Sequence, residues 1–120
     1  MGGRVNNNLY KLKQLFNKDY EIKLLDEEFK RVALNSFSQI YWSKTCDTLL
    51  NKLYFKQQFI ERINSYEAYY KSLPKKYQEI LYENLHNKVP LESLAIKYNI
   101  HIRSLFRRIN RIDLALSHIN

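Results

Sequence analysis

Residues 88–112 of this 120-residue chain read KVPLESLAIKYNIHIRSLFRRINRI, and their pattern predicts two short helices joined by a sharp turn. A helix can begin at Val89-Pro90, because the first turn of a helix needs no hydrogen bond from the proline nitrogen. Asn99 stands where the chain must turn, and Asn adopts the left-handed conformation more readily than other non-glycine residues. Beyond the turn, apolar residues repeat at helical spacing at Leu105, Ile109 and Ile112. The stretch is therefore typical of a helix-turn-helix.

The second of these helices is expected to bury its apolar residues and to expose arginines on its other side. The exposed arginines would be Arg103, Arg107 and Arg111. An apolar stripe backed by arginines suits a helix that packs on one side and meets the phosphates and base edges of DNA on the other. Phe106 is expected to pack on the longest helix of the chain rather than to stack on a base.

The net charge of +8 is concentrated in two segments. Residues 1–18 hold four basic residues and no acid, and residues 97–112 hold five basic residues and no acid. Residues 19–96 hold 11 basic and 11 acidic residues, so this central segment is neutral. A local excess of positive charge attracts a polyanion, and nucleic acid is the usual one. The charge pattern therefore favours double-stranded DNA as the partner.

The composition predicts an all-α protein, because the chain has only two glycines and two prolines to break helices. No apolar run approaches the roughly 20 residues of a membrane span, so we expect no membrane contact and a cytoplasmic, nucleoid-associated protein. Cys46 is the one cysteine and the three histidines lack metal-ligand spacing, so no metal and no other cofactor is expected. Helix capping explains the acidic pair Glu27 and Glu28 better than catalysis does, so we do not expect an enzyme.

The hydrophobic pattern predicts three helices before residue 72. They are expected over about residues 8–17, from Asp26 to about Tyr41, and over residues 47–71. Asp26 with the two acids that follow it is typical of a helix start, since negative charge favours that end of the helix dipole. The helix that begins there is expected to fade near residues 43–45.

The segment Ser72-Leu73-Pro74 is expected to end the longest helix and to begin another. We therefore place a boundary between an N-terminal helical region, residues 1–71, and a C-terminal helix-turn-helix domain, residues 72–120. The N-terminal region is a candidate surface for dimerisation or for a partner.

Several short motifs after residue 72 follow one another in the order of a known family. Leu73-Pro74 with Lys75, Lys76, Gln78, Glu79, Ile80 and Leu81 is similar to an "LP…(R)E(V)L" opening. Ser93-Leu94-Ala95 stands where the family has "EIA", and Ile100 stands where it has the Ile of "GIS". Ser104-Leu105 replaces its "TV", and Ile109 replaces a Leu. Arg111 coincides with the Arg of its "RA". Residues 73–116 thus resemble region 4 of the sigma-70-type transcription initiation factors, without a gap from Leu94 to Leu116. The resemblance implies a DNA-binding transcription regulator, and such domains also occur in small phage and mobile-element regulators.

The sequence departs from the family at the turn and at the start of the second helix. Asn99 replaces the usual Gly, and Ser93 replaces the usual Glu. His101-Ile102-Arg103 replaces a small polar helix start, so the base preference of the family does not carry over. The segment Val32–Lys44 faintly resembles part of the promoter-melting region, but too little chain follows it before residue 73 to complete that region, so a full sigma factor is not expected.

In the DNA-binding interpretation, the helix from about Ile102 to Ile112 enters the major groove. The expected base-reading residues are Arg103, Arg107 and Asn110, since Arg pairs with guanine O6 and N7 and Asn with adenine. The expected phosphate contacts are Lys75, Lys76, Lys97, Ser104, Arg108 and Arg111.

Aromatic side chains surround much of the 47–71 helix and are too many for one buried face. They are Tyr54, Phe55, Phe59, Tyr66, Tyr69 and Tyr70. Some must be exposed or covered by a partner, either a second copy in a homodimer or RNA polymerase. Two further interpretations stay open beside the transcription regulator. One is a plasmid or phage accessory protein that binds DNA in replication or conjugative transfer, and the other is a helical protein-interaction adaptor without DNA binding.

Overall fold

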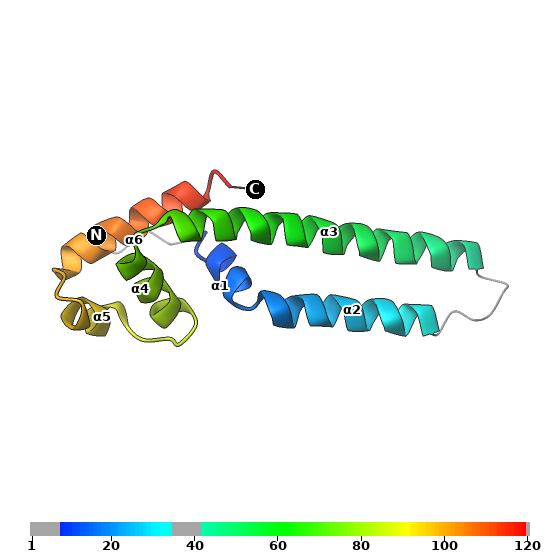
Figure 1. The fold of residues 1–120 in the computed structure, drawn as a ribbon, viewed down its shortest axis with the longest axis horizontal. Helices are drawn as coiled ribbons and strands as arrows, with labels where there is room; N and C mark the ends of the chain where they lie inside the picture. The colour runs from blue at the N-terminus through cyan, green and yellow to red at the C-terminus, as the bar shows by residue number, and fades with distance from the viewer. Residues whose placement is uncertain (1–7, 35–41, 120) are drawn as a thin grey trace. The chain divides into compact units, whose positions relative to one another are not determined.

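The computed structural model describes residues 8–34 and 42–119, and these residues are folded into helices with no strand. The predicted all-α fold is confirmed. The helices are α1 (Tyr10–Phe16), α2 (Lys18–Leu34), α3 (Trp42–Ser72), α4 (Lys75–Leu85), α5 (Leu91–Lys97) and α6 (Ile102–Leu116), as Figure 1 shows. Within the described ranges, none of these helices has the length and apolar character needed to cross a membrane.

The helices belong to two compact units. Unit 1 consists of Met1–Phe16 and Asn64–Asn120, and unit 2 consists of Asn17–Ile63. Unit 1 contains the whole of residues 72–120 and adds α1 and the last turns of α3, because α1 contacts α4. Its limits therefore differ from the boundary expected after residue 71. The helix α3 itself runs from unit 2 into unit 1.

The start of α2 differs from the sequence prediction. The helix begins at Lys18 rather than at Asp26, so the prediction of a helix start at Asp26 was wrong. Asp19 already supplies negative charge in the first turn, where it favours the helix dipole. Asp26 lies within the helix, and its Oδ1 atom is 2.5 Å from Nζ of Lys56 on α3. Its carboxylate therefore forms an ion pair between helices instead of capping one.

The expected end of that helix also needs correction. Residues 35–41, which include its predicted last turn, lie outside the described residues. The next helix, α3, begins at Trp42, so residues 43–45 belong to a helix rather than to a fading helix end. The expected boundaries of the remaining helices agree with α1, α3 and α4 to within a few residues.

The largest fully buried side chains of the described residues all lie in unit 1. They are Leu12, Ile80, Leu81, Leu94, Leu105, Ile109, Ile112 and Leu116. These residues come from α1, α4, α5 and α6, so the four helices share one apolar core. Burying aliphatic side chains stabilises each by roughly 1.5–3 kcal/mol, and this core is the main source of stability of unit 1.

Two buried charges connect α1 with the end of α6. Lys11 is 7% exposed, and its Nζ donates hydrogen bonds to the carbonyl oxygens of Leu116 at 2.7 Å and Ile119 at 2.6 Å. In the other direction, the Asn8 N–H donates to Oδ1 of Asp113 at 2.8 Å, just before α1 begins. The cation thus lies at the C-terminus of one helix and the anion at the N-terminus of the other, where each complements the helix dipole.

Candidate nucleic-acid interface

The helix α6 has one buried face and one exposed face. The buried face carries Leu105, Ile109, Ile112 and Leu116. The exposed face carries Arg103, Arg107 and Arg111. Both sets follow from the helical repeat of 3.6 residues, which brings residues three or four apart onto the same side. The sequence prediction of a packed apolar stripe opposite three exposed arginines is confirmed.

A tight turn sets the direction in which α6 leaves α5. Asn99 has a φ of 55°, the left-handed conformation expected for this position. The N–H of Ile100 donates to the carbonyl oxygen of Ala95 at 2.8 Å and closes the end of α5. His101 then caps α6, since its Nδ1 accepts a hydrogen bond from the N–H of Arg103 at 3.2 Å. The first turn of α6 is therefore held by the backbone and by a side-chain cap.

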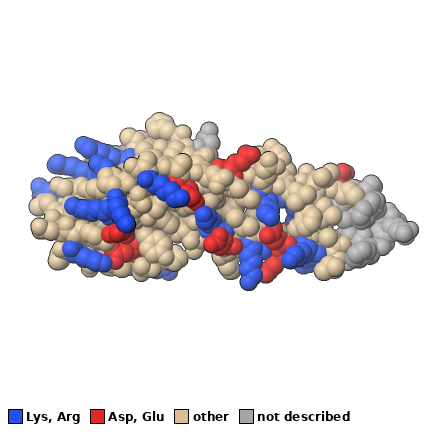
Figure 2. Space-filling model, in the orientation of Figure 1, with Lys and Arg blue, Asp and Glu red and all other residues tan. Residues whose placement is uncertain are grey.

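Of the three residues expected to read bases, Arg103 and Arg107 are exposed and Asn110 is half-buried. The two arginines are one turn apart, and neither forms an ion pair with any residue that the structure describes. Figure 2 shows Lys and Arg side chains on the surface of the part of unit 1 where Figure 1 places α5 and α6. An unpaired guanidinium on a solvent-facing helix surface keeps its five donors available for a ligand.

The residues expected to hold phosphates are in different situations. Ser104 and Arg111 are exposed on α6, and Lys75 and Lys76 are exposed at the start of α4. Arg108 is half-buried, and its Cζ lies 4.7 Å from the centre of the Tyr77 ring. This cation–π contact holds the Arg108 side chain against α4, while Ser104, Arg111 and Lys76 remain open to solvent.

Lys97, another expected phosphate contact, already has an anionic partner. Its Nζ lies 2.6 Å from Oε1 of Glu83 on α4 and 5.4 Å from the centre of the Tyr98 ring. The side chain remains more than half exposed. A phosphate that bound Lys97 would therefore have to share it with Glu83, which distinguishes this lysine from the arginines of α6.

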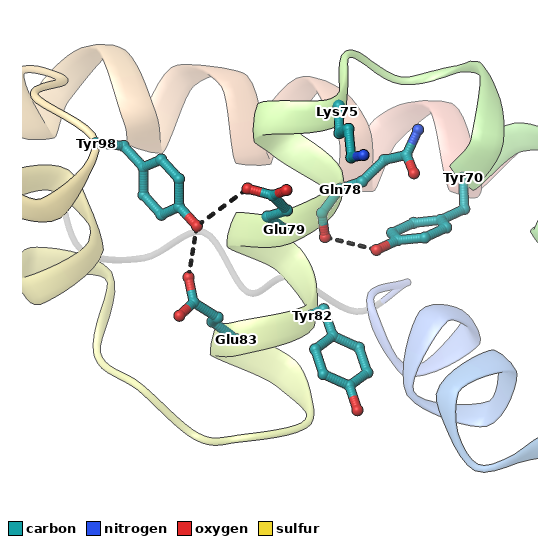
Figure 3. A pocket seen from close by; sticks show the side chains of 7 residues that line it. All are labelled: Tyr70, Lys75, Gln78, Glu79, Tyr82, Glu83 and Tyr98. Carbon is teal, nitrogen blue, oxygen red and sulfur yellow. Dashed lines mark hydrogen bonds between the residues drawn. The ribbon is translucent and has the colours of Figure 1, made fainter.

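A hollow of about 340 Å³ lies beside α4 and the end of α5, and Figure 3 shows the side chains around it. It is lined by Tyr70, Lys75, Gln78, Glu79, Tyr82, Glu83 and Tyr98. The Tyr98 hydroxyl donates to Oε2 of Glu83 at 2.8 Å, and Oε2 of Glu79 lies 3.4 Å from the same hydroxyl. The Tyr70 hydroxyl donates to the carbonyl oxygen of Gln78 at 2.6 Å. These bonds connect α5 and the end of α3 with α4, so the hollow has a structural role.

The hydrogen bonds in this hollow shift the pKa values of Tyr98 and Glu83. The bond to the Glu83 carboxylate raises the pKa of Tyr98 to about 12, because it stabilises the protonated hydroxyl. Hydrogen bonds from Lys97 and then from Tyr98 lower the pKa of Glu83. Burial, with Glu79 nearby, raises the pKa of Tyr70. Each pKa shift favours the protonation state in which the contacts between these helices form.

A second hollow, of about 660 Å³, lies at the turn between α5 and α6. It is lined by Glu92, Ala95, Ile96, Asn99, Ile100, His101 and Ile102. Its lining is mostly apolar, and Ile96 is 83% exposed. Among the described residues, no three His, Cys, Asp or Glu side chains are grouped so that they could hold a metal ion.

Sequence reasoning assigned no functional role to two features near α6. Phe106 was expected to pack on the longest helix, but its side chain is 41% exposed beside the arginines. Phe106 follows the buried Leu105 and lies about 100° around the helix from it. This spacing places Phe106 at the edge of the buried face. The sequence contains no local signal for the contact of Lys11 with the end of α6 or for the contact of Asp113 with the start of α1. The residues in each contact are 105 positions apart.

Comparisons with protein-family models, with curated proteins and with solved structures found no match to this chain.

Proposed function

We propose that unit 1 is a helix-turn-helix domain that binds double-stranded DNA, with α6 as the helix that enters the major groove. The observation that carries this proposal is the exposed arginine face of α6, opposite a face whose leucines and isoleucines are buried. The B-DNA major groove is about 12 Å wide and admits an α-helix of this kind. The resemblance of residues 73–116 to region 4 of sigma factors supports the same assignment.

The spacing of the arginines suits base reading. Arg103 and Arg107 are four residues apart, which is about 6 Å along a helix axis. Two base-pair steps of about 3.4 Å span nearly the same distance, so each guanidinium meets a different base pair. An Arg side chain donates two hydrogen bonds to O6 and N7 of guanine, and the site therefore favours guanine at both positions.

The charges of the two units support a polyanionic ligand for unit 1. Residues 17–63 carry eight Lys and Arg against seven Asp and Glu, whereas the rest of the chain carries 12 against five. The exposed phosphate contacts without an ion pair to a described residue include Ser104, Arg111, Lys75 and Lys76, and Arg108 adds a fixed charge beside them. With about four to six phosphate contacts, the logarithm of the binding constant falls against the logarithm of salt concentration with a slope of roughly −4 to −5.

The biological role that fits this domain best is regulation of transcription. A sigma-like DNA-reading domain suits a regulator that acts near a promoter. Co-purification of RNA polymerase with the tagged protein on promoter DNA tests this role. An accessory protein for replication or transfer would bind DNA without retaining the polymerase.

The direct test is selection of bound duplexes from a random library, followed by titration of the selected site by fluorescence anisotropy at several salt concentrations. We expect one enriched motif containing guanines and a salt slope in the range above. The variant Arg103→Ala/Arg107→Ala is expected to lose the preference for the motif while keeping its helical circular dichroism signal. Arg62→Ala, an exposed arginine of unit 2, serves as the matched control and should bind like the wild type. Absence of salt-dependent binding to any duplex would overturn the proposal.

A further inference from the structure

Among the residues of unit 2 that the structure describes, more large apolar side chains are exposed than are buried. On α3 these are Leu50, Leu53, Tyr54 and Phe55, and on α2 they include Leu24 and Leu34, with exposures from 42% to 67%. Among its described residues, the buried apolar side chains are Phe59 and Ile63. No residue of α2 is buried at all. Exposed apolar side chains that lie next to one another can mark an interaction site.

The contacts that hold the two helices of unit 2 together include two partly exposed ion pairs. Nζ of Lys52 lies 2.5 Å from Oε1 of Glu28, and Nζ of Lys56 lies 2.5 Å from Oδ1 of Asp26. The Lys52 bond lowers the pKa of Glu28. Partly exposed pairs of this type contribute little to stability, because water and salt screen them. The ion pairs orient α2 against α3, and additional buried apolar surface is needed to stabilise the hairpin.

Part of the exposed apolar surface forms a face on α3. Leu50, Leu53 and Tyr54 are three and four residues apart, which places them side by side along the helix. Phe55 lies about 160° around the helix from Leu53 and so outside this stripe, although the centres of the Tyr54 and Phe55 rings are 6.3 Å apart. We call Leu50, Leu53 and Tyr54 the α3 apolar face. A stripe at this spacing is typical of a helix that packs against another helix.

A second copy of the chain is the occupant that fits this face. Unit 2 spans residues 17–63 and is nearly neutral, with eight basic and seven acidic residues, so two copies do not repel each other there. Pairing through the strongly basic unit 1 would bring like charges together. A helical hairpin of this size needs help to remain folded, and the chain has one cysteine, so it contains no internal disulfide to provide it. Association of two copies supplies the missing buried surface.

We propose that the protein forms a homodimer in which α2 and α3 of unit 2 pack against the same helices of a second copy. Two helical hairpins that pair about a two-fold axis form a four-helix bundle, with the α3 apolar face at its centre. The dimer does not depend on DNA binding. If unit 1 binds DNA as proposed, the dimer carries two reading helices and fits a site with two half-sites.

Sedimentation equilibrium without DNA tests the dimer. The wild type is expected at twice 14.6 kDa at micromolar concentration. The variant Leu50→Gln/Leu53→Gln should sediment at 14.6 kDa, because both side chains are exposed in the single chain and form the interface in the dimer. Ile96→Gln removes an exposed apolar side chain from unit 1 instead and should remain dimeric.

A second measurement on the unmodified protein guards against a variant that fails to fold. The Tm of a dimer rises with protein concentration, whereas the Tm of a monomer does not. We expect the wild-type Tm to rise over a hundredfold concentration range. A monomeric wild type, a Tm independent of concentration, or a dimer that persists in the folded double variant would each overturn this interface. DNA titration of the same samples reports separately on the proposed function, so the two proposals fail independently.

Discussion

The hydroxyl of Tyr98, at the end of α5, donates a hydrogen bond of 2.8 Å to Glu83 of α4. Lys97, the preceding residue, lies 2.6 Å from the other oxygen of the same carboxylate. One carboxylate thus holds two consecutive residues next to Asn99, where the chain turns into α6. The orientation of the exposed arginine face depends on this attachment as well as on the apolar core.

We expect the stability that Tyr98 contributes to depend on pH. The folded pKa of Tyr98 is about 12, above the ordinary value of 10, so its contribution is complete below pH 10 and is lost as pH rises toward 12. The pKa of Glu83 is lowered, so its contribution is present above its ordinary value of 4.5 and is lost as pH falls through the folded value.

Urea unfolding of the wild type and of Tyr98→Phe measures this effect. The wild type should be the more stable protein at pH 7, and the difference should shrink between pH 10 and 12. It should also shrink in acid, where the acceptor Glu83 becomes protonated. A difference that stays constant across the whole range would show that the hydroxyl bond is not formed in solution.

The Lys11 side chain is expected to stabilise unit 1 through its ammonium group. Lys11→Met keeps most of the buried stem but removes the two hydrogen bonds to the carbonyls of Leu116 and Ile119. Hydrogen bonds from charged donors contribute about 1.5–3 kcal/mol, and we expect a loss of free energy of unfolding of this size. Lys13→Met, an exposed lysine of the same helix, should change the value by less than about 0.5 kcal/mol. Equal effects of the two substitutions in urea titrations would contradict the buried contact.

The turns and faces of the C-terminal helices could be predicted because their signals are local. Pro74 and Pro90 immediately precede α4 and α5, and Asn99 adopts the left-handed conformation expected of it. The spacing of Leu105 and its neighbours determines which side of α6 is buried, and hence that Arg103 and Arg107 are exposed. Each of these signals acts within one or two helical turns of the residue concerned.

Contacts between distant residues could not be predicted in the same way. The acids around Asp26 form a pattern that suits either a helix start or an ion pair, and only Lys56, 30 residues away, decides between them. The pairing of Lys97 with Glu83 likewise depends on how α5 lies against α4. A charge count treats Lys97 as equivalent to the arginines of α6, although its charge is already partly satisfied.

Two substitutions should separate base reading from phosphate binding within the proposed interface. Arg107→Ala is expected to weaken binding to the selected site by about 1–3 kcal/mol, which is roughly 5- to 150-fold, with little change for scrambled DNA. Lys76→Ala should weaken binding to both DNAs alike and reduce the steepness of the salt slope by about one unit. Anisotropy titrations at three salt concentrations measure the loss of affinity of each variant for the selected duplex and for the scrambled duplex. An equal loss of affinity for selected and scrambled DNA would show that Arg107 does not read a base.

The exposure of Phe106 leads to a prediction about thymine, which rests on the proposed DNA binding. Phe106 is 41% exposed on α6 and lies beside Arg103 and Arg107, so a helix seated in the major groove brings its ring to the base edges. The C5-methyl group of thymine is the apolar group available there. Replacing thymine by uracil in the selected site removes this methyl without changing base pairing.

We expect the uracil duplex to bind the wild type roughly fourfold more weakly for each methyl contact that is lost, which corresponds to about 0.8 kcal/mol. Phe106→Ala should bind the thymine duplex more weakly and should no longer distinguish the two duplexes. Arg107→Ala serves as the control, because it removes a polar contact and leaves the ring in place, so it should still prefer thymine. If Phe106→Ala retained the wild-type preference for thymine, the ring would not contact the methyl group. The preference would then have to come from other side chains of α6 or from the shape of the DNA.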